Sequence, residues 1–314
     1  MLSRVADSLY WIGRYCERTE TNAHILTTRL DHMIELSRED SNYRFEWEAI
    51  IKICGYFNDF KNKHDGYYLK KMIRYLLCDN ENLNSITSMV ESYRMNARNT
   101  RDLLPNELWE EWNDLYLSIK EKDKEETSII STYDFLSNIR KSSLTASGII
   151  DSLMTRDECY LFLKIGKWIE RAEKTAIIIN ELLEYEEQFT DDFIATYSLQ
   201  LTHSFEEYTR RSRNRSKQKV LNFLVGDLKC SRSIAHSIHK IKEAILEVEN
   251  GKIEVYAVEM FEALAKLEDI LQVDTSSLTQ EACKEWVKDI RDQCTNFGPI
   301  FSKTYYLTPP ILVT

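Results

Sequence analysis

Proline removes a backbone N–H and clashes with the preceding helical turn, and this 314-residue chain has only four prolines. They lie at positions 105, 299, 309 and 310, and glycine is also scarce, with eight residues. Long stretches therefore contain no residue that would end a helix. Too few turn-forming residues remain for a β-sandwich or a loop-rich nucleotide-binding fold. This distribution predicts long α-helices.

Apolar residues recur at spacings of three and four in two segments, as they do along the buried face of a helix. One segment runs from Leu9 to Leu30 and the other from Phe162 to Leu183. Thr155-Arg-Asp-Glu158 reads as a capping box, so we expect the second helix to begin at about residue 156. Further helices are expected at about 44–60, 67–78, 83–103, 106–121, 128–153, 191–212, 217–225, 231–250, 253–272 and 279–297, before an irregular tail over 303–314.

The sequence also contains an internal repeat. GRYCERTETNAHIL (13–26) aligns with GKWIERAEKTAIII (166–179), about half a chain length further on. A second pair of similar segments is LLCDNENLNSI (76–86) and LVGDLKCSRSI (224–234). We interpret this as duplication of a helical unit, with repeats over 1–154 and 155–302. No linker rich in Gly, Pro or Ser separates them, so we expect one all-α helical bundle of two tandem pseudo-repeats.

The repeated motif places charged residues beside the buried helix face. A glycine in a helix costs roughly 1 kcal/mol relative to alanine, so the repeated Gly13 and Gly166 indicate close approach of another helix. Helical geometry puts the Glu side chains at the edge of the same apolar stripe. We therefore predict a polar site between the repeats, formed by Arg14, Glu17, Arg18, Glu20, Glu170, Arg171 and Glu173.

Two interpretations of this polar site are open. The Glu and Arg residues could be partly buried ion pairs that set the register of the two repeats. They could instead surround a ligand or partner group. A di-iron carboxylate site needs Glu-x-x-His, whereas this motif has Glu-x-x-Glu, and His24 is matched by Ile177. We therefore predict no metal. His236 and His239, three residues apart, are expected to face solvent rather than to chelate.

Basic side chains at three further places are candidates for contact with an anion or a partner. Arg94, Arg98 and Arg101 share one helix face and could contact an anion or a partner, or lie on a solvated face. The run YTRRSRNRSKQK, which contains Arg211, and the isolated Arg156 are the other candidates for anion or partner contact. RNA is disfavoured, because the formal net charge is -10 and aromatic residues do not interleave this run.

Several classes of chemistry lack their usual motif. No G-x-G-x-x-G, Walker or G-x-S-x-G sequence occurs, so no cofactor is predicted and no catalytic residue is identified. The seven cysteines form no C-x-x-C pair and are expected to be reduced core thiols. Charged residues occur within the first few positions, before the apolar region of a signal peptide could form. No stretch approaches the 18 uncharged apolar residues of a membrane-spanning helix. We expect a cytoplasmic protein that binds neither membrane nor nucleic acid.

MLSRVADSLYWIGRYCERTE and the later GKWIERAEKTA resemble the bacterial Alpha-E domain family, an all-helical family named for its Glu-Arg motif. DNENLNSI, RMNARNTRD, NELWEEWNDLYLSI and LMTRDECYLFLKIGKWIERAE are similar to further blocks of that family, in the expected order over nearly the whole chain. The chain departs from the family pattern at Leu83, where a Pro is usual, at Cys159 and Tyr160, which replace Gly-Trp, and at Lys167, which replaces an Arg.

The resemblance implies a functional context more than a reaction. Members of the family are typically encoded beside circularly permuted ATP-grasp ligases, transglutaminase-like proteins and NTN-hydrolase-type peptidases. This implies a non-catalytic accessory or scaffold in peptide synthesis or modification, with an ATP-grasp amide ligase as partner and a peptide as possible ligand. The alternative is an enzyme that uses Glu17, Glu20, Glu170 and Glu173 in amide-bond chemistry, by acid-base catalysis or with a divalent metal. The sequence leaves the peptide, the partner and the oligomeric state open.

Overall fold

The computed structural model describes residues 1–35, 43–121, 128–273, 275 and 278–305. Within these ranges every regular element is helical, which confirms the all-α fold. The elements of the first half are α1 (Ser3–Glu35), α2 (Tyr43–Cys54), α3 (Phe57–Lys63), α4 (Leu69–Cys78), α5 (Ile86–Asn99), η1 (Arg101–Leu103), α6 (Asn106–Glu121) and α7 (Ile129–Leu153). Those of the second half are α8 (Glu158–Glu184), α9 (Asp191–Leu201), α10 (Phe205–Arg211), α11 (Lys217–Gly226), α12 (Ile234–Val248), η2 (Val255–Ala257), α13 (Val258–Ile270) and α14 (Gln280–Thr304).

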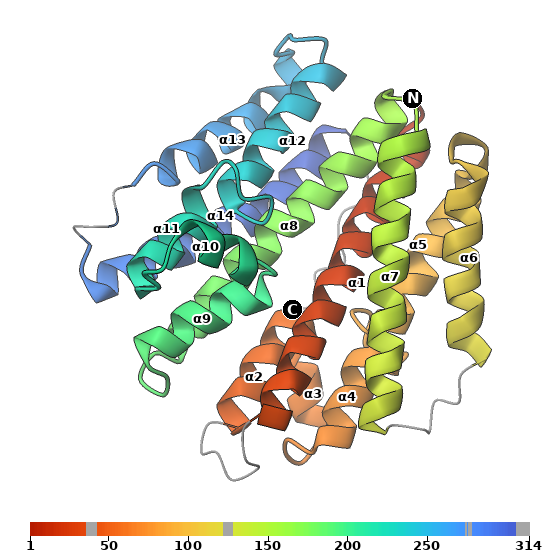
Figure 1. The fold of residues 1–314 in the computed structure, drawn as a ribbon. Coiled ribbons are helices and arrows are strands. Elements are labelled where there is room, and N and C mark those ends of the chain that lie inside the picture. Colours follow the sequence, from red (N-terminus) through yellow and green to blue (C-terminus); the bar gives the residue numbers. More distant parts are fainter. Residues whose placement is uncertain (36–42, 122–127, 274, 276–277, 306–314) are drawn as a thin grey trace.

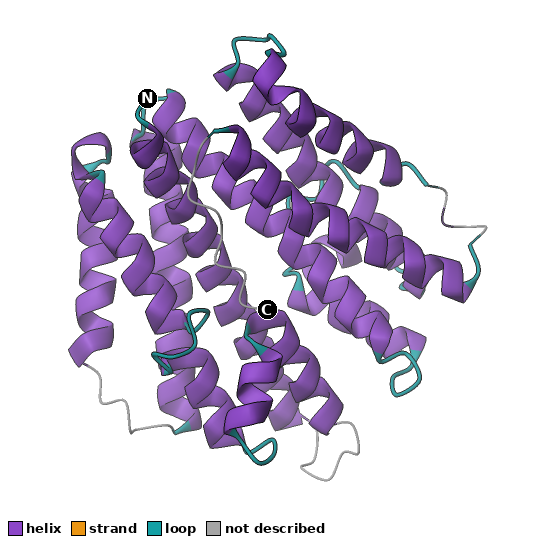
Figure 2. Cartoon of the chain, turned by 180° about the vertical axis from the view of Figure 1, so that it is seen from behind, coloured by secondary structure: helices purple, strands orange, loops and turns teal. Residues whose placement is uncertain are grey.

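The two long helices α1 and α8 lie side by side at the centre of the molecule (Figure 1). Helix α1 also packs against α5 and α7, and α8 packs against α12 and α14. Figure 2 shows from behind that short loops join most of the helices. Each central helix is therefore surrounded by other helices, which explains why its apolar stripe is broad and why Leu9, Ile12 and Ile165 are fully buried.

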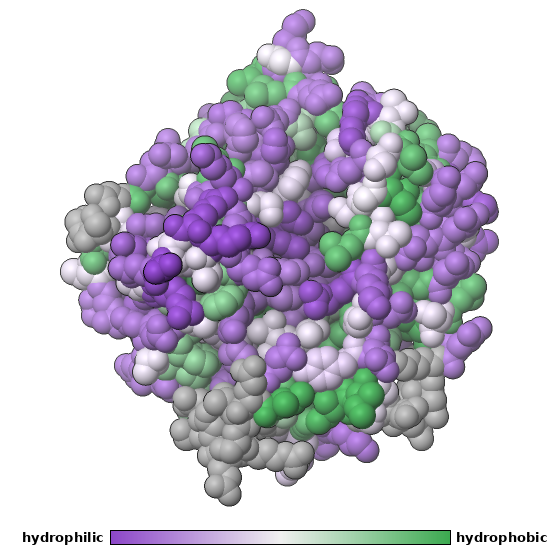
Figure 3. Space-filling model, viewed as in Figure 1, coloured by the Kyte–Doolittle hydropathy of each residue, from purple (hydrophilic) through white to green (hydrophobic). Residues whose placement is uncertain are grey.

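The surface of the molecule is more polar than this apolar interior. The face seen in Figure 3 is mostly hydrophilic, with hydrophobic residues in smaller groups between hydrophilic ones. All seven cysteines are free, and Cys54, Cys230, Cys283 and Cys294 are buried. Cys16, Cys78 and Cys159 are partly exposed, so the prediction of core thiols is confirmed for four of the seven.

Two of the predicted helices are interrupted. The helix expected over 44–60 is divided into α2 and α3 at Gly55 and Tyr56. The helix expected over 191–212 is divided into α9 and α10, because His203 adopts a left-handed conformation with φ of 58°. The backbone N–H of Ser204 then bonds back to the carbonyl of Leu199 at 2.8 Å, which closes the end of α9.

Two predicted helix ends are also wrong. Helix α8 begins at Glu158 with Asp157 as its N-cap, rather than with Thr155, because the Asp157 carboxylate accepts from the N–H groups of Cys159 and Tyr160. Helix α14 continues through Pro299 to Thr304, so residues 303 and 304, which were expected in an irregular tail, are helical, and 306–314 lies outside the described residues. Phe301 stacks on Tyr10 with ring centroids 5.2 Å apart, and this packing offsets the hydrogen bond lost at proline.

Candidate functional site

The candidate site lies where α1 crosses α8, and glycine makes this crossing possible. A Cβ atom added to Gly13 would lie 2.0 Å from the carbonyl oxygen of Leu163. A Cβ added to Gly166 would lie 2.1 Å from the carbonyl oxygen of Tyr10. The two helix backbones are thus in direct contact, and the predicted close approach of another helix at both glycines is confirmed.

The two Glu-Arg motifs pair reciprocally across this crossing. Arg18 donates from Nε to Oε1 of Glu170 at 2.6 Å and from Nη2 to Oε2 at 2.8 Å. Arg171 donates from Nε and Nη2 to the two carboxylate oxygens of Glu17, at 2.6 and 2.8 Å. Each arginine therefore forms a bidentate ion pair with the glutamate of the other motif, the geometry that best fits a guanidinium to a carboxylate.

The remaining predicted residues extend the same network. Arg14 donates to Glu170 at 2.6 Å and to Glu173 at 2.5 Å. Glu20 accepts from Arg232 at 3.0 Å. All seven residues predicted for the inter-repeat site are therefore brought together. Their charges balance only with Arg232, which also donates to Glu17 at 3.0 Å.

Arg232 was not predicted, and neither was Asn84, which accepts from Arg18 at 2.8 Å. A sequence signal for both residues was nevertheless present in the second pair of repeated segments. Asn84 and Arg232 occupy the same position in DNENLNSI and in the corresponding DLKCSRSI, one residue before Ser85 and Ser233. In both segments that serine caps the following helix. The residue before each cap therefore points back to the central helices.

Burial and pairing set the protonation of the carboxylates. Burial alone would raise the pKa of Glu17, but Arg171 and Arg232 outweigh it and lower the pKa to about 2. The pKa of Glu170 is lowered to about 2 in the same way, by Arg18 and Arg14 against burial. Glu173 differs, because burial raises its pKa and Arg14 offsets this only in part. Glu17 and Glu170 are therefore fully ionised at neutral pH.

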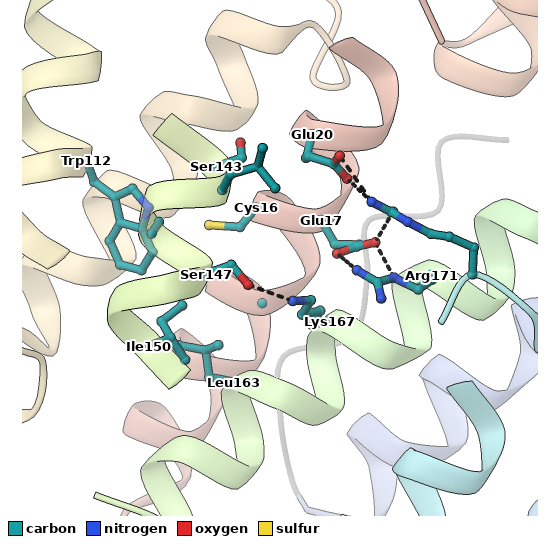
Figure 4. Close-up of a pocket in the computed structure, with 14 residues that line it drawn as sticks. Cys16, Glu17, Glu20, Trp112, Ser143, Ser147, Ile150, Leu163, Lys167 and Arg171 are labelled. Carbon is teal, nitrogen blue, oxygen red and sulfur yellow. Dashed lines mark hydrogen bonds and ion pairs between the residues drawn. The ribbon is translucent and has the colours of Figure 1, made fainter. Parts of the chain in front are cut away.

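A cavity of about 70 Å³ lies beside the network, between α1, α7 and α8 (Figure 4). The carboxylates of Glu17 and Glu20 line one side of it. Lys167, on α8, also lines it and donates from Nζ to Oγ of Ser147 on α7 at 3.0 Å. Burial and the nearby Arg171 lower the pKa of Lys167 to about 8, although Glu17 opposes this.

The structure places the other predicted basic residues elsewhere. Arg94 and Arg101 both lie over the ring of Trp109, at 5.4 and 5.1 Å from its centroid, while Arg98 is exposed. Arg156 pairs with Asp151 at 3.8 Å, and Arg211 pairs with Asp227 at 2.9 Å. Arg156 and Arg211 are thus occupied locally. Only Arg94, Arg98 and Arg101 form a group, here called the α5 arginine cluster.

His236 and His239 have separate partners, a backbone carbonyl at Leu228 and the carboxylate of Glu243. Across the described ranges, no group of three or more His, Cys, Asp or Glu side chains could hold a metal ion. In the same ranges no helix is long and apolar enough to cross a membrane.

An all-helical chain whose two central helices exchange Glu-Arg ion pairs across a glycine crossing defines a helical domain of the ER-motif class. The model of the Alpha-E family, described as a predicted alpha-helical domain with a conserved ER motif, matches residues 1–306. The chain belongs to the Alpha-E family. The geometry shows what the motif residues do here: they join the two halves of the bundle through buried ion pairs.

Two mycobacterial proteins are similar to this chain. An uncharacterized protein of Mycobacterium bovis and one of Mycobacterium tuberculosis are each 25% identical to this chain over 257 residues. These matches cover 76% of this chain but only 29% of each relative. The chain thus spans less than a third of the length of these relatives. No solved structure matches the chain.

A histidine next to the network should make folding sensitive to acid. His24 stacks on His203 with ring centroids 4.2 Å apart, and burial together with His203 lowers its pKa to about 4. The unfolded chain binds a proton at this histidine near pH 6.5, whereas the folded chain binds it only near pH 4. The folded state therefore keeps its full stability above pH 6.5 and loses stability relative to the unfolded state as pH falls from 6.5 toward 4. Between pH 7.5 and 5.0 this residue should account for up to about 2 kcal/mol of lost stability.

The check is chemical denaturation of the wild type and of His24→Gln at both pH values. Gln retains a donor for the carbonyl of Gln200, which His24 contacts at 2.7 Å. We expect the variant to lose less stability in acid than the wild type does. His239→Gln, at a side chain 52% exposed, is the matched control for loss of an imidazole at the surface. Equal acid sensitivity in all three proteins would contradict the assignment to His24.

Proposed function

We propose that this chain is a non-catalytic helical accessory or scaffold in a peptide synthesis or modification system, and that it acts beside an ATP-grasp type amide ligase. The observation that carries the proposal is the length of the mycobacterial relatives, since the matched region is 29% of each. In those proteins the helical unit is covalently joined to further polypeptide. A unit held close to another in one chain has a high effective concentration for it, which favours contact between the two.

The chemistry of the Glu-Arg network supports the non-catalytic part of the proposal. A general base works best when its pKa is near the operating pH. Glu17 and Glu170, with pKa values of about 2, are weak bases, and bidentate arginines occupy their oxygens. Residues held in this way are suited to fixing the geometry of a bundle rather than to moving protons.

One observation favours the enzyme alternative. Glu173 has a raised pKa, as a general acid in amide-bond chemistry would. It is, however, bonded to Arg14 and does not line the cavity between α1, α7 and α8. Under the accessory proposal, Glu173→Gln leaves the partner's ligase turnover unchanged.

The test of the accessory role is a pull-down from native lysate with the tagged full chain, together with metal analysis of the purified protein. We expect recovery of an ATP-grasp ligase or a transglutaminase-like protein, and no stoichiometric metal. Stoichiometric metal without a partner would contradict the proposal and favour the enzyme alternative.

The α5 arginine cluster is the candidate contact for this partner, since Arg98 and Arg101 are exposed and positively charged. Arg98→Glu reverses one exposed charge and should lower partner recovery by about tenfold, because like charges at an interface cost several kcal/mol. Lys266→Glu makes the same reversal on an exposed face of α13 and serves as the matched control. Equal recovery with both variants would remove the cluster from the interface.

A further inference from the structure

The cavity between α1, α7 and α8 has one polar wall and one apolar wall. Ser143, Ser147 and Lys167 supply hydroxyl and ammonium groups to it. Trp112, Ile150 and Leu163 supply apolar surface (Figure 4). Leu144 also lines the cavity and is 61% exposed, so the space reaches the protein surface along α7. A site of this form suits a ligand with a polar end and a short hydrocarbon part.

The charges around the cavity leave one positive charge without a counterion. Glu17 and Glu20 are matched by Arg171 and Arg232, which hold them in ion pairs. Lys167 is the remaining cation, and its hydrogen bond goes to the neutral Ser147. In the described ranges no carboxylate oxygen lies within ion-pair distance of Lys167 Nζ. A buried charge that is not paired is costly, and an anion of charge -1 would neutralise it.

The donors also match a carboxylate. An ammonium group has three N–H donors, and Lys167 uses one of them on Ser147. Ser147 accepts that bond, so its own O–H is free to donate to a ligand. Two or three donors therefore converge beside the apolar wall. A cavity of 70 Å³ holds roughly five water-sized volumes, which is room for about five non-hydrogen atoms.

We propose that this cavity is a binding site for a small monocarboxylate with a short apolar chain, held by Lys167 and Ser147, with its hydrocarbon part against Trp112, Ile150 and Leu163. A phosphate would bring up to two negative charges to a cavity that has one to neutralise, so a carboxylate fits better. The proposal stands on the cavity alone and holds whether or not the chain serves a ligase.

Binding should depend on pH through Lys167. The groups that face it are Glu17 and Cys16 on α1, Asp151 on α7, and Lys164 and Arg171 on α8. Only the ammonium form attracts a carboxylate, and its pKa is about 8. Affinity should therefore be nearly constant between about pH 6 and 7, where both the carboxylate and the lysine are charged, and about tenfold weaker at pH 9, where roughly a tenth of the lysine is protonated.

The experiment is isothermal titration calorimetry of the full chain with sodium propionate at pH 7, with propionamide as the neutral ligand of the same shape. We expect propionate to bind and propionamide to bind at least about tenfold more weakly. Lys167→Met should weaken propionate by a similar factor. Lys141→Met is the matched control, because Lys141 is an exposed lysine on α7, the helix that carries Ser147. It should bind propionate as the wild type does.

Three outcomes would overturn the proposal: no propionate binding up to roughly 50 mM, equal affinity for propionamide, or unchanged affinity in Lys167→Met. Thermal melting of each variant shows whether it folds. If Lys167→Met does not fold, Ser147→Ala takes its place, since it removes one ligand donor and keeps the charge. A severalfold loss of propionate affinity in Ser147→Ala supports the proposal, and wild-type affinity contradicts it.

Discussion

Gly166→Ala should destabilise the protein more than any substitution on its surface. The added methyl group would lie 2.1 Å from the carbonyl oxygen of Tyr10 and 3.2 Å from the backbone nitrogen of Arg14. Both neighbours are backbone atoms, so no side chain can turn away, and α1 must separate from α8. Overpacking in a core costs about 1–3 kcal/mol and occasionally more, and we expect at least about 3 kcal/mol here. Urea denaturation followed by far-ultraviolet circular dichroism measures the loss. Gly13→Ala should behave alike, since its Cβ would lie 2.0 Å from the carbonyl oxygen of Leu163.

Gly148→Ala is the matched control for this prediction. Gly148 lies within α7, and, apart from the adjoining backbone of α7 itself, no described atom lies within 4 Å of an added Cβ. Alanine is the better helix former, so this variant should gain up to about 1 kcal/mol. The two substitutions therefore have opposite expected signs although their chemistry is identical. A Gly166→Ala protein as stable as Gly148→Ala would mean that the helix crossing is wrongly placed.

The sequence was informative about this crossing because both glycines stand in helices where any other residue would be more favourable. The repeated Glu-Arg pairs next to them were predicted to border the same seam, and they do. The reciprocal pairing of Arg18 with Glu170 and of Arg171 with Glu17 could not be predicted. Helical periodicity places a side chain on a face, but the relative rotation and offset of two distant helices decide which side chains meet.

Other features depend on contacts that periodicity does not encode. The bond between Lys167 and Ser147 joins α8 to α7, and nothing in either segment marks the pair. The continuation of α14 through Pro299 depends on Phe301 packing against Tyr10, about 290 residues away in sequence. The break at His203 required a left-handed backbone at a residue that is not glycine. In each case tertiary packing overrides the local signal.

The duplication itself stays a prediction, although the described elements fall in the order that it would give. The helices from α1 to α7 and those from α8 to α14 have similar lengths in sequence, with seven residues in both α3 and α10 and ten in both α4 and α11. Ser85 and Ser233 cap corresponding helices in the same way, since each side chain accepts a hydrogen bond from the backbone N–H three residues later.

Glu170→Gln should lower the free energy of unfolding by about 3 kcal/mol. Glutamine keeps the shape of the side chain and removes its charge, which leaves the buried Arg14 and the mostly buried Arg18 without their shared counterion. Breaking such a buried pair costs more than the pair contributes, because the remaining charges stay desolvated. Glu259→Gln is the matched control: it breaks an exposed pair with Lys303, at side chains 56% and 71% exposed, and should cost less than about 1 kcal/mol.

The same variant separates a structural role of the Glu-Arg motif from a binding role. The pKa of Glu170 is about 2 in the folded protein and lies near 4.3 in an unfolded chain. Its stabilising effect is therefore complete above about pH 4.5 and is lost as pH falls toward 2, so Glu170→Gln should be less sensitive to acid in that range. If Glu170→Gln melts at a lower temperature and supports the ligase reaction of the proposed partner in proportion to its folded fraction, the motif is structural. If it keeps its melting temperature and loses that support, the carboxylate contacts a ligand or partner, and the ion pairs seen at the crossing are the state of the site before binding.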